Sequence, residues 1–383
     1  MKSYLIKNST VYPVSSPPFK GDVLLENGKI KKLSETIQPT KNDVVIDASG
    51  QYLFPGLIDV HTHLGMYNEG TGWAGNDANE TTEAITPHIR ALDGVYPMDI
   101  AFSDAVESGV TCAHIMPGSA NIIGGTTSVI KTYGKDIDKM LLKDVAGLKI
   151  ALGENPKKTH SNPSKGNMTR MGVIASLRET FINVLLETNA LNLDSPRYSS
   201  VRKALKREIP IRVHAHRTDD IISAIRLAEE FNLDLRIEHC TEGHLISEEI
   251  KERVKQVSVG PTLTRKSKVE LKNKSWDAYS VLSNCGIEVS ITTDHPYIPI
   301  QCLNVVAALA VREGLSEDLA LKGITLFPAK NLGVDKSVGS IEEGKDADVV
   351  IWSDHLFNFM AKPQYVWING DLIYSKEAIS NIY

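Results

Sequence analysis

The middle of the chain alternates short apolar runs with segments of helical periodicity, and this alternation restricts the fold more than any other feature. After the apolar run at residues 211–214, apolar side chains recur at helical spacing at Ile221, Ile222, Ile225, Ala228 and Phe231. The next run begins at residue 235, and similar units start near residues 109, 147, 257 and 287. Strands that alternate with helices predict a parallel sheet with crossover helices.

Length and composition restrict the remaining classes of protein. The 383 residues suit one large barrel or two smaller domains, and a composition of 42% hydrophobic and 23% charged residues indicates a packed core. The formal net charge is -5 with both signs scattered along the chain, so no basic stripe indicates nucleic acid or an anionic membrane surface. No apolar run is long enough to span a membrane.

Two further features lead us to expect a cytoplasmic protein. Lys7 and Asn8 interrupt the first residues before any long apolar region, which argues against a signal peptide. The four cysteines lie far apart and form no CxxC pair, so we expect reduced thiols at Cys112, Cys240, Cys285 and Cys302.

Both ends of the chain have the pattern of β structure. An Asn-Gly pair, which tolerates positive φ in a hairpin turn, separates two short apolar runs at Asn27-Gly28 and again at Asn369-Gly370. The two hairpins could be unrelated edges, but we favour one small β-sandwich that both termini complete, built from residues 1–53 and 341–383. Residues 54–340 would then form the barrel.

The motif His61-Thr62-His63 follows the apolar run at residues 54–60. Because side chains alternate with period two, a strand that ends in His-x-His places both imidazoles on one face. At the C-terminal mouth of a barrel, that face points toward the site. Two neutral imidazoles in this position suit a divalent metal such as zinc. Alone, the motif is equally compatible with two solvated loop histidines.

Three more residues of metal-ligand type end predicted strands farther along the chain. An apolar run leads to each of His214, His239 and Asp294. Any one of them could be a structural residue, but their common position predicts a metal centre at one end of the barrel. His216 lies two residues beyond His214 and shares its face, so it is an alternative ligand, although we favour a role in substrate binding or proton transfer.

The residues that carry this pattern resemble a known superfamily. Residues 55–63, Pro-Gly-Leu-Ile-Asp-Val-His-Thr-His, resemble the opening signature of the amidohydrolase superfamily. His214, His239 and Asp294 match the later positions of its metal pattern. Residues 339–350 resemble its closing signature, where the chain leaves the barrel for the sandwich, so the resemblance extends over essentially the whole chain.

This resemblance implies a (β/α)₈ TIM barrel with an appended β-sandwich and a metal centre of one or two divalent ions. The chain is most similar to the branch that contains imidazolonepropionase-like proteins and dipeptidases. One departure lies at Phe327, where the element before the closing signature usually has asparagine. That position is remote from the metal pattern and leaves the resemblance intact.

The ligand from the fourth barrel strand has two candidates. Members with two metals use a carboxylated lysine or a glutamate there, and in this chain the strand carries Lys149 in its middle and Glu154 at its mouth. Gly153-Glu154 resembles a pair in related metal-dependent deoxyribonucleases. A glutamate is already anionic and needs no CO₂ adduct, so we favour Glu154. Either side chain could instead be structural, and a mononuclear site stays open.

Two further residues are candidate substrate contacts, beside His216. Asn121 lies in the Gly-rich segment at residues 117–126, which follows a predicted strand and lacks a phosphate-binding fingerprint, so it is either a substrate-lining loop or an ordinary turn. Arg217 could hold a substrate carboxylate through two parallel N–H bonds, or could be a surface arginine.

Together these features predict a hydrolase that cuts a carbon–nitrogen bond in a small molecule, such as an amide, cyclic imide, amidine or dipeptide. A bound metal lowers the pKa of water, and Asp294 can take that proton and pass it to the leaving nitrogen. Nitrogen-rich ligands suit zinc, with iron or manganese as alternatives. The alternatives are a deaminase of an aminated heterocycle and a non-catalytic scaffold barrel. A homo-oligomer is possible.

Overall fold

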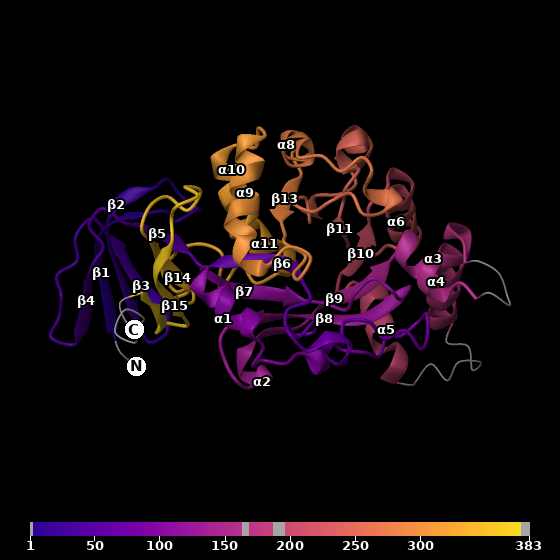
Figure 1. Cartoon of the computed structure of the whole chain (residues 1–383), viewed down its shortest axis with the longest axis horizontal. Helices are drawn as coiled ribbons and strands as arrows, with labels where there is room; N and C mark the ends of the chain where they lie inside the picture. The colour runs from indigo at the N-terminus through magenta and orange to yellow at the C-terminus, as the bar shows by residue number, and fades with distance from the viewer. Residues whose placement is uncertain (1–2, 163–167, 187–195, 377–383) are drawn as a thin grey trace.

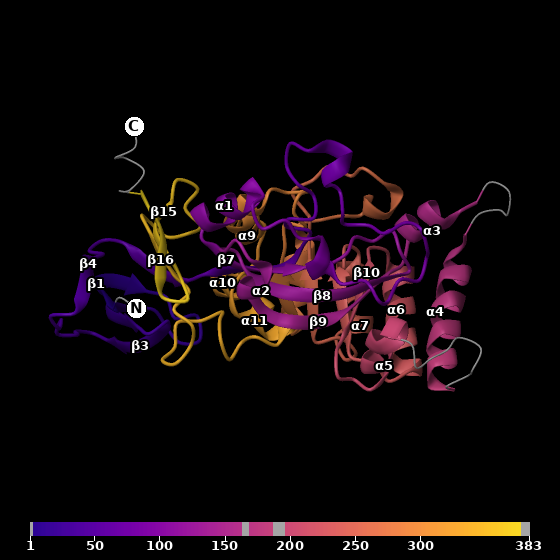
Figure 2. The same ribbon diagram turned by 90° about the horizontal axis from the view of Figure 1, so that it is seen from below.

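The computed structural model of the protein describes residues 3–162, 168–186 and 196–376. It contains two eight-stranded sheets, which lie side by side along the long axis of the molecule (Figures 1 and 2). Strands from both ends of the chain form the first, here called the terminal sheet, and strands from the middle form the second, the barrel sheet. None of the helices in the described ranges is long and apolar enough to cross a membrane.

The terminal sheet combines the first five strands with the last three. They are β1 (Ser3–Val11), β2 (Phe19–Glu26), β3 (Lys29–Ser34), β4 (Asp43–Asp47), β5 (Tyr52–Pro55), β14 (Val349–Trp352), β15 (Pro363–Ile368) and β16 (Asp371–Ser375). The order is β16–β15–β14–β5–β1–β2–β3, with β4 paired to β1. Antiparallel pairing of β14 with β5 joins the end of the chain to its start, so both ends share one sheet as expected.

The two predicted hairpin turns form, and they touch each other. Asn27 and Gly28 connect β2 to β3 at φ 53° and 78°, and Asn369 and Gly370 connect β15 to β16 at φ 51° and 77°. A Cβ atom on Gly370 would lie 2.8 Å from the Cα of Gly28. The two turns are therefore in backbone contact, which requires glycine at this position.

The barrel sheet consists of eight strands in chain order. They are β6 (Leu57–Thr62), β7 (Val110–Ile115), β8 (Ile123–Lys131), β9 (Leu141–Ala151), β10 (Ile211–Ala215), β11 (Leu235–His239), β12 (Gln256–Val259) and β13 (Glu288–Ile291). The N–H of His63 donates to the carbonyl of His295 at 2.9 Å, and the Thr292 hydroxyl donates to the carbonyl of His61 at 2.7 Å. These bonds link the two ends of the sheet, which is nearly closed.

One strand departs from the expected all-parallel barrel. β8 runs antiparallel to both β7 and β9, whereas the other neighbouring strands are parallel. Only residues 116–122 connect β7 to β8. A parallel crossover needs about a dozen residues or more, so this connection permits only a reversal of direction. The expected (β/α)₈ barrel is thus present as a mixed, nearly closed sheet.

Helices pack against the barrel sheet. They are α1 (Ile100–Glu107), α2 (Ile137–Met140), α3 (Glu154–His160), α4 (Arg170–Leu185), α5 (Ser199–Leu205), α6 (Thr218–Glu230), α7 (Ser247–Ile250), α8 (Asp277–Asn284), α9 (Leu303–Arg312), α10 (Glu317–Gly323) and α11 (Leu326–Leu332). α6 contacts β10 and β11, and α11 contacts β6 and β13. The apolar face predicted for α6 is buried at Ile221, Ile225 and Ala228. The candidate functional site is therefore formed by the ends of the parallel strands and the segments that follow them.

Candidate metal centre

The five residues of the predicted metal pattern converge at the C-terminal ends of barrel-sheet strands. His61 lies in β6 and His63 directly follows it, His214 lies in β10, His239 ends β11, and Asp294 follows β13. All five side chains are buried. Because the carboxyl ends of these parallel strands meet at one end of the barrel, residues far apart in the sequence become neighbours.

Distances between these side chains are short. The ring centroid of His239 lies 4.5 Å from that of His61 and 4.4 Å from that of His214. One carboxylate oxygen of Asp294, Oδ1, lies 3.5 Å from Nε2 of His61 and 3.4 Å from Nε2 of His63. The aspartate therefore faces the opening His-x-His motif directly.

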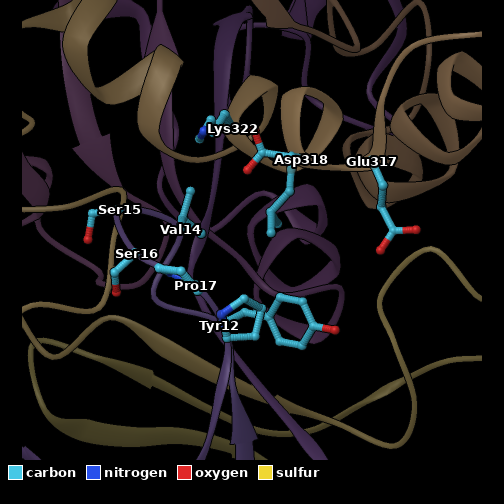
Figure 3. Close-up of a pocket in the computed structure, with 10 residues that line it drawn as sticks. Tyr12, Val14, Ser15, Ser16, Pro17, Glu317, Asp318 and Lys322 are labelled. Atoms are coloured by element: carbon cyan, nitrogen blue, oxygen red, sulfur yellow. Dashed lines mark hydrogen bonds and ion pairs between the residues drawn. The ribbon is translucent and has the colours of Figure 1, made fainter.

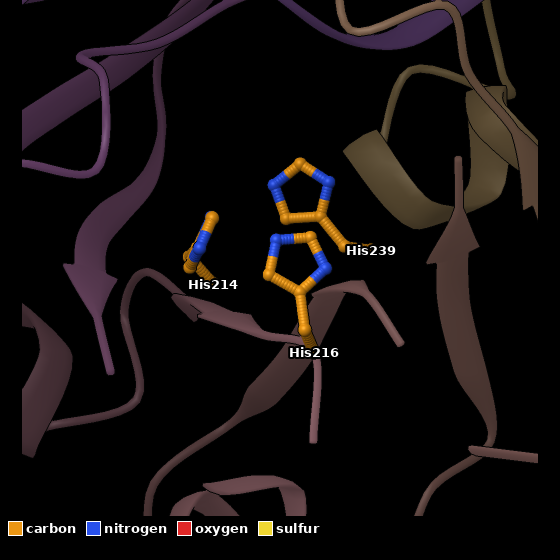
Figure 4. Close-up of side chains that lie close together, drawn as sticks. All are labelled: His214, His216 and His239. Atoms are coloured by element: carbon orange, nitrogen blue, oxygen red, sulfur yellow. The ribbon is translucent and has the colours of Figure 1, made fainter. Parts of the chain in front are cut away.

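The side chains form two adjoining groups of potential ligands. Within each group the ligand atoms lie within 4.8 Å of one another: His61, His239 and Asp294 in one, and His214, His216 and His239 in the other (Figure 4). His239 belongs to both groups. His216, which the sequence left between ligand and substrate contact, stacks on His239 with ring centroids 4.7 Å apart.

Hydrogen bonds from outside the cluster fix the rings of four histidines. In each, Nδ1 lies 2.7–2.9 Å from an oxygen: His61 from Glu238 Oε2, His63 from Met116 O, His216 from Thr241 Oγ1 and His239 from Gly260 O. Such a partner fixes the tautomer and the orientation of a metal-binding ring. The Nε2 atoms are therefore left available to the centre of the cluster.

Several atoms in the cluster have unmet bonding capacity. Both ring nitrogens of His214 and Oδ1 of Asp294 are buried without a hydrogen-bond partner among the residues described. Burial lowers the pKa of His61, His214 and His216 well below the ordinary histidine value. Neutral imidazoles beside a carboxylate are the donor set that a divalent transition metal takes. The residues present thus fit a metal ion.

The structure separates the two candidates from the fourth strand. Lys149 in β9 is buried, and its Nζ lies 3.4 Å from Nε2 of His61. Burial lowers the pKa of Lys149 to about 8. Glu154 lies beyond the end of β9, in the first turn of α3, where its Oε1 accepts the N–H of Glu270 at 3.2 Å. The favoured Glu154 is thus engaged elsewhere, while Lys149 reaches the cluster.

Two of the predicted ligands have unusual backbone conformations. His239 has φ 72° and Asp294 has φ 54°. Left-handed backbone at a residue other than glycine costs on the order of 1–3 kcal/mol and concentrates at functional sites. Side chains on a strand normally alternate between its two faces, yet the consecutive residues Glu238 and His239 both contact the cluster. The left-handed backbone at His239 is consistent with this departure from alternation at the end of β11.

Sequence reasoning missed the support beneath the cluster. Glu238 accepts a hydrogen bond from Nη1 of Arg212 at 3.0 Å, and both side chains are fully buried. Arg212 also donates to the side chain and the carbonyl of Asn331, at 2.9 and 3.0 Å. Burial alone would raise the pKa of Glu238, but Arg212 and Lys149 hold it below the ordinary value. The pair thus gives His61 an ionised carboxylate partner.

The predicted substrate contacts lie in different places. His216 lines a cavity of about 760 Å³ that the metal cluster opens into. Asn121 is not among the residues that line this cavity. Its buried side-chain amide instead donates to the carbonyl of Glu83 and to the hydroxyl of Thr86. Arg217 also lies outside its lining and pairs with Asp219 through two N–H bonds of 3.0 Å.

The cavity wall includes side chains that the sequence gave no reason to select. They come from the segments after the strands and include Tyr67, Asn79, Lys158, Arg265, Lys268 and Tyr297. These segments have no periodic pattern, so nothing in their sequence marks them as lining. Gly118, Ser119 and Ala120 also line the cavity, and they belong to the Gly-rich segment that was predicted as a substrate-lining loop or an ordinary turn. A second cavity, of about 490 Å³, lies between residues 12–18 and α10 (Figure 3). None of its lining residues is a histidine or cysteine, so it lacks the chemistry of the first.

Comparison with known proteins identifies the family. The sequence profile of the amidohydrolase family matches residues 52–373. The chain therefore belongs to the amidohydrolase family, whose members are hydrolases that act on carbon–nitrogen bonds. The resemblance stated from its motifs is confirmed.

Individual relatives agree with this assignment. A crystal structure of an amidohydrolase from Thermotoga maritima MSB8 has a TM-score of 0.92 and 42% identity, covering 97% of this chain and all of that one. An amidohydrolase named tasK from Hapsidospora irregularis is 28% identical over 91% of this chain. The match spans only 39% of the length of tasK. Imidazolonepropionase of Colwellia psychrerythraea is 26% identical over 85% of this chain and 82% of its own length. A 5-methylthioadenosine/S-adenosylhomocysteine deaminase of Desulforudis audaxviator is 25% identical over 91% and 84%.

Proposed function

We propose that this chain is a metal-dependent hydrolase that cleaves a carbon–nitrogen bond of a small molecule by attack of water. The observation that carries the proposal is the buried cluster of His61, His63, His214, His239 and Asp294, in which both ring nitrogens of His214 and Oδ1 of Asp294 have no hydrogen-bond partner among the described residues. Burying such groups without a ligand is costly. A scaffold barrel has no need of them.

The ligands in this proposal are the same five residues together with Lys149. The position of Lys149 against His61 supports its carboxylated form over Glu154 as the anionic ligand from the fourth strand that would help to hold the metal. Nitrogen-rich ligands favour zinc, with iron and manganese as alternatives. Such an ion, when bound, makes hydroxide available at neutral pH and polarises a carbonyl.

Asp294 has the position of the proton carrier. It lines the cavity, and its Oδ1 makes no hydrogen bond to another described residue. It can therefore accept a proton from water at that oxygen and deliver it to the leaving nitrogen. His295 is the rival, but it is not part of the cavity lining. Its Nδ1 accepts the N–H of Ile300 at 3.2 Å, and burial lowers its pKa to about 4.

A deaminase is the second candidate, and the similarity to a deaminase of Desulforudis audaxviator favours it specifically. Both reactions use water and a proton carrier in the same positions. They differ in their products. A deaminase releases ammonia from a heterocycle, whereas an amide hydrolase releases an acid together with an amine or ammonia.

Metal analysis followed by a substrate screen tests the proposal. Purified protein grown with ample zinc, iron and manganese should contain one or two transition-metal ions per chain. Replacement of His214 by alanine should reduce the metal content, while His88→Ala, at an exposed histidine outside the cluster, should not. Dipeptides, cyclic ureides and aminated heterocycles form the screen, with ammonia and acid release measured separately. Protein without metal under these conditions would exclude the proposal.

A further inference from the structure

The lining of the cavity above the metal centre carries positive charge. Among the described residues that line it, the charged side chains beyond the cluster itself are all cationic: Lys158, Arg265 and Lys268. Asp294 is the acidic side chain in the same lining, and it belongs to the metal centre. A cleft lined by one sign of charge raises the local concentration of ligands with the opposite sign.

Two of these three cations have no partner among the residues that the structure describes. Lys268 is neutralised by the buried carboxylate of Glu270, with Nζ and Oε1 2.6 Å apart, and it also donates to the side chain of Asn155. Arg265 and Lys158 make no hydrogen bond or ion pair with any other residue of the described ranges, and both are exposed. They are thus free to bind a ligand.

The segment that carries Arg265 is anchored in the protein. Nζ of Lys274 donates to the hydroxyl and the carbonyl of Thr264, at 2.6 and 2.5 Å. Farther along, Glu270 and Glu154 exchange backbone N–H and carboxylate bonds of 3.0 and 3.2 Å, which tie this segment to α3, the helix of Lys158. An anchored segment loses less conformational freedom when a ligand binds.

The lining also includes polar side chains without charge. Tyr67 accepts a hydrogen bond from the side chain of Asn79 at 3.1 Å and is hydrogen-bonded to Tyr297. Arg217, which the sequence singled out as a carboxylate contact, is engaged by Asp219 and cannot supply positive charge to the lining.

We propose that the substrate carries an anionic oxygen group, a carboxylate or a phosphate-type group, which Arg265 and Lys158 bind while the carbon–nitrogen bond faces the histidine cluster. The second half of this statement rests on the proposed function; the anion site does not. Arg265 can bind either group through two parallel N–H bonds, and Lys158 adds a point charge.

Three probes that differ only in one terminal group test the anion site without turnover. They are N-acetylglycine, its neutral carboxamide, and N-acetylaminomethylphosphonate. Their binding to zinc-treated protein is measured by isothermal titration calorimetry at low and high salt. We expect at least one anion to bind about tenfold or more tightly than the carboxamide, because charge-assisted bonds are stronger than neutral ones. The difference should shrink at high salt. The stronger of the two anions identifies the group.

Matched variants locate the site. Arg265→Gln and Lys158→Gln should each remove most of the preference for the anion, and Arg265→Lys should restore part of it. Lys272→Gln makes the same charge change at an exposed lysine of the same segment that does not line the cavity, and it should leave binding unchanged. An anion preference that persists in the Arg265→Gln/Lys158→Gln double variant would mean that the metal centre holds the anion, and would overturn the proposal. Equal binding of anion and carboxamide by the wild type would also overturn it.

The anion site and the proposed function fail in different ways. Protein that binds no metal but prefers the anionic probe, with loss in Arg265→Gln, retains the anion site and loses the hydrolase. Protein that binds metal and hydrolyses only neutral substrates, with no anion preference, retains the hydrolase and loses the anion site.

Discussion

Two buried ion clusters in this protein are alike in chemistry and differ in what they touch. In the barrel pair, Arg212 and Glu238 meet at 3.0 Å beneath the candidate metal centre. In the junction cluster, Lys131 of β8 contacts Asp348 at 2.7 Å and Asp346 at 3.0 Å, where the chain leaves the barrel for β14. All of these side chains are largely removed from water.

The two clusters differ in what contacts the second oxygen of each carboxylate, the oxygen that does not bind the cation. The free oxygen of Glu238 lies 2.9 Å from Nδ1 of His61, so the barrel pair leads to a predicted metal ligand. The free oxygen of Asp348 accepts the N–H of Asn369 at 2.9 Å, so the junction cluster leads to the hairpin turn between β15 and β16. A buried ion pair by itself therefore says little about function. What the carboxylate contacts with its second oxygen indicates whether the ion pair supports a candidate site or joins the two sheets.

The largest effect is expected from Glu238→Gln. This change leaves the guanidinium of Arg212 buried without a counter-charge, which costs about 3–5 kcal/mol of unfolding free energy. It also weakens the partner that orients His61, so metal affinity should fall about 10–100-fold. Urea unfolding of metal-free protein measures the first effect, and competition with a chelator measures the second. Unchanged zinc affinity in a folded variant would show that the barrel pair is purely structural.

Lys131→Met breaks the junction cluster and should affect stability alone. It leaves two carboxylates without their buried cation, and we expect a loss near the lower end of the same range, about 3 kcal/mol, because Lys29 still contacts Asp346 at 2.6 Å. Metal content should equal that of the wild type. Lys29→Met is the control: this lysine is half exposed, so its removal should cost no more than about 1 kcal/mol. Loss of metal in folded Lys131→Met would contradict the distinction between the clusters.

Individual residues also show why only part of this candidate site could be predicted. His61, His63, His214, His239 and Asp294 each end an apolar run, and the ends of parallel strands meet in space, so local pattern was sufficient. The choice between Lys149 and Glu154 depended on where β9 ends. The chain turns into α3 at Gly153, which has φ 86°, and this carries Glu154 away from the cluster.

Other features needed information that local pattern lacks. Glu238 and His239 are consecutive, and strict alternation would place them on opposite faces of the strand. The left-handed backbone at His239 is a tertiary effect that no residue type announced. The reversed direction of β8 could have been predicted, because the segment at residues 116–122 is too short for a crossover. The Gly-rich composition of that segment predicted only a substrate-lining loop or an ordinary turn.

Asp294→Asn tests the chemistry that the barrel pair is proposed to support. Asparagine keeps the shape and one carbonyl oxygen but cannot carry the proton. We expect most of the metal to be retained and kcat to fall roughly 10²-fold or more, about 2.7 kcal/mol in the barrier. Steady-state kinetics with the best substrate of the screen measures this. His295→Ala is the comparison and should retain near-normal turnover; the reverse result would assign the proton to His295. Metal loss in Asp294→Asn would instead make Asp294 an essential ligand.

The smallest effect is the pH dependence of the junction cluster. Burial works to raise the pKa of Asp346, but the nearby lysines outweigh it and hold that pKa below the ordinary aspartate value of 3.8. A carboxylate with a lowered pKa stabilises the folded state above its unfolded pKa, and this contribution disappears as the pH falls through the folded value.

Burial likewise works to lower the pKa of Lys131, but Asp348 and Asp346 raise that pKa above 10.5. The stabilisation from Lys131 is therefore complete below pH 10.5 and disappears as the pH rises through the raised value. The difference in urea midpoint between wild type and Lys131→Met should therefore be constant from neutral pH to about pH 9 and narrow on acidification, because the carboxylates left without Lys131 take up protons at a higher pH than those of the wild type. The same comparison for Lys29→Met should show little change, because an exposed lysine couples weakly to the carboxylate. A wild-type advantage that persists unchanged at acid pH would mean that Lys131 stabilises the junction by packing its aliphatic stem rather than by its charge.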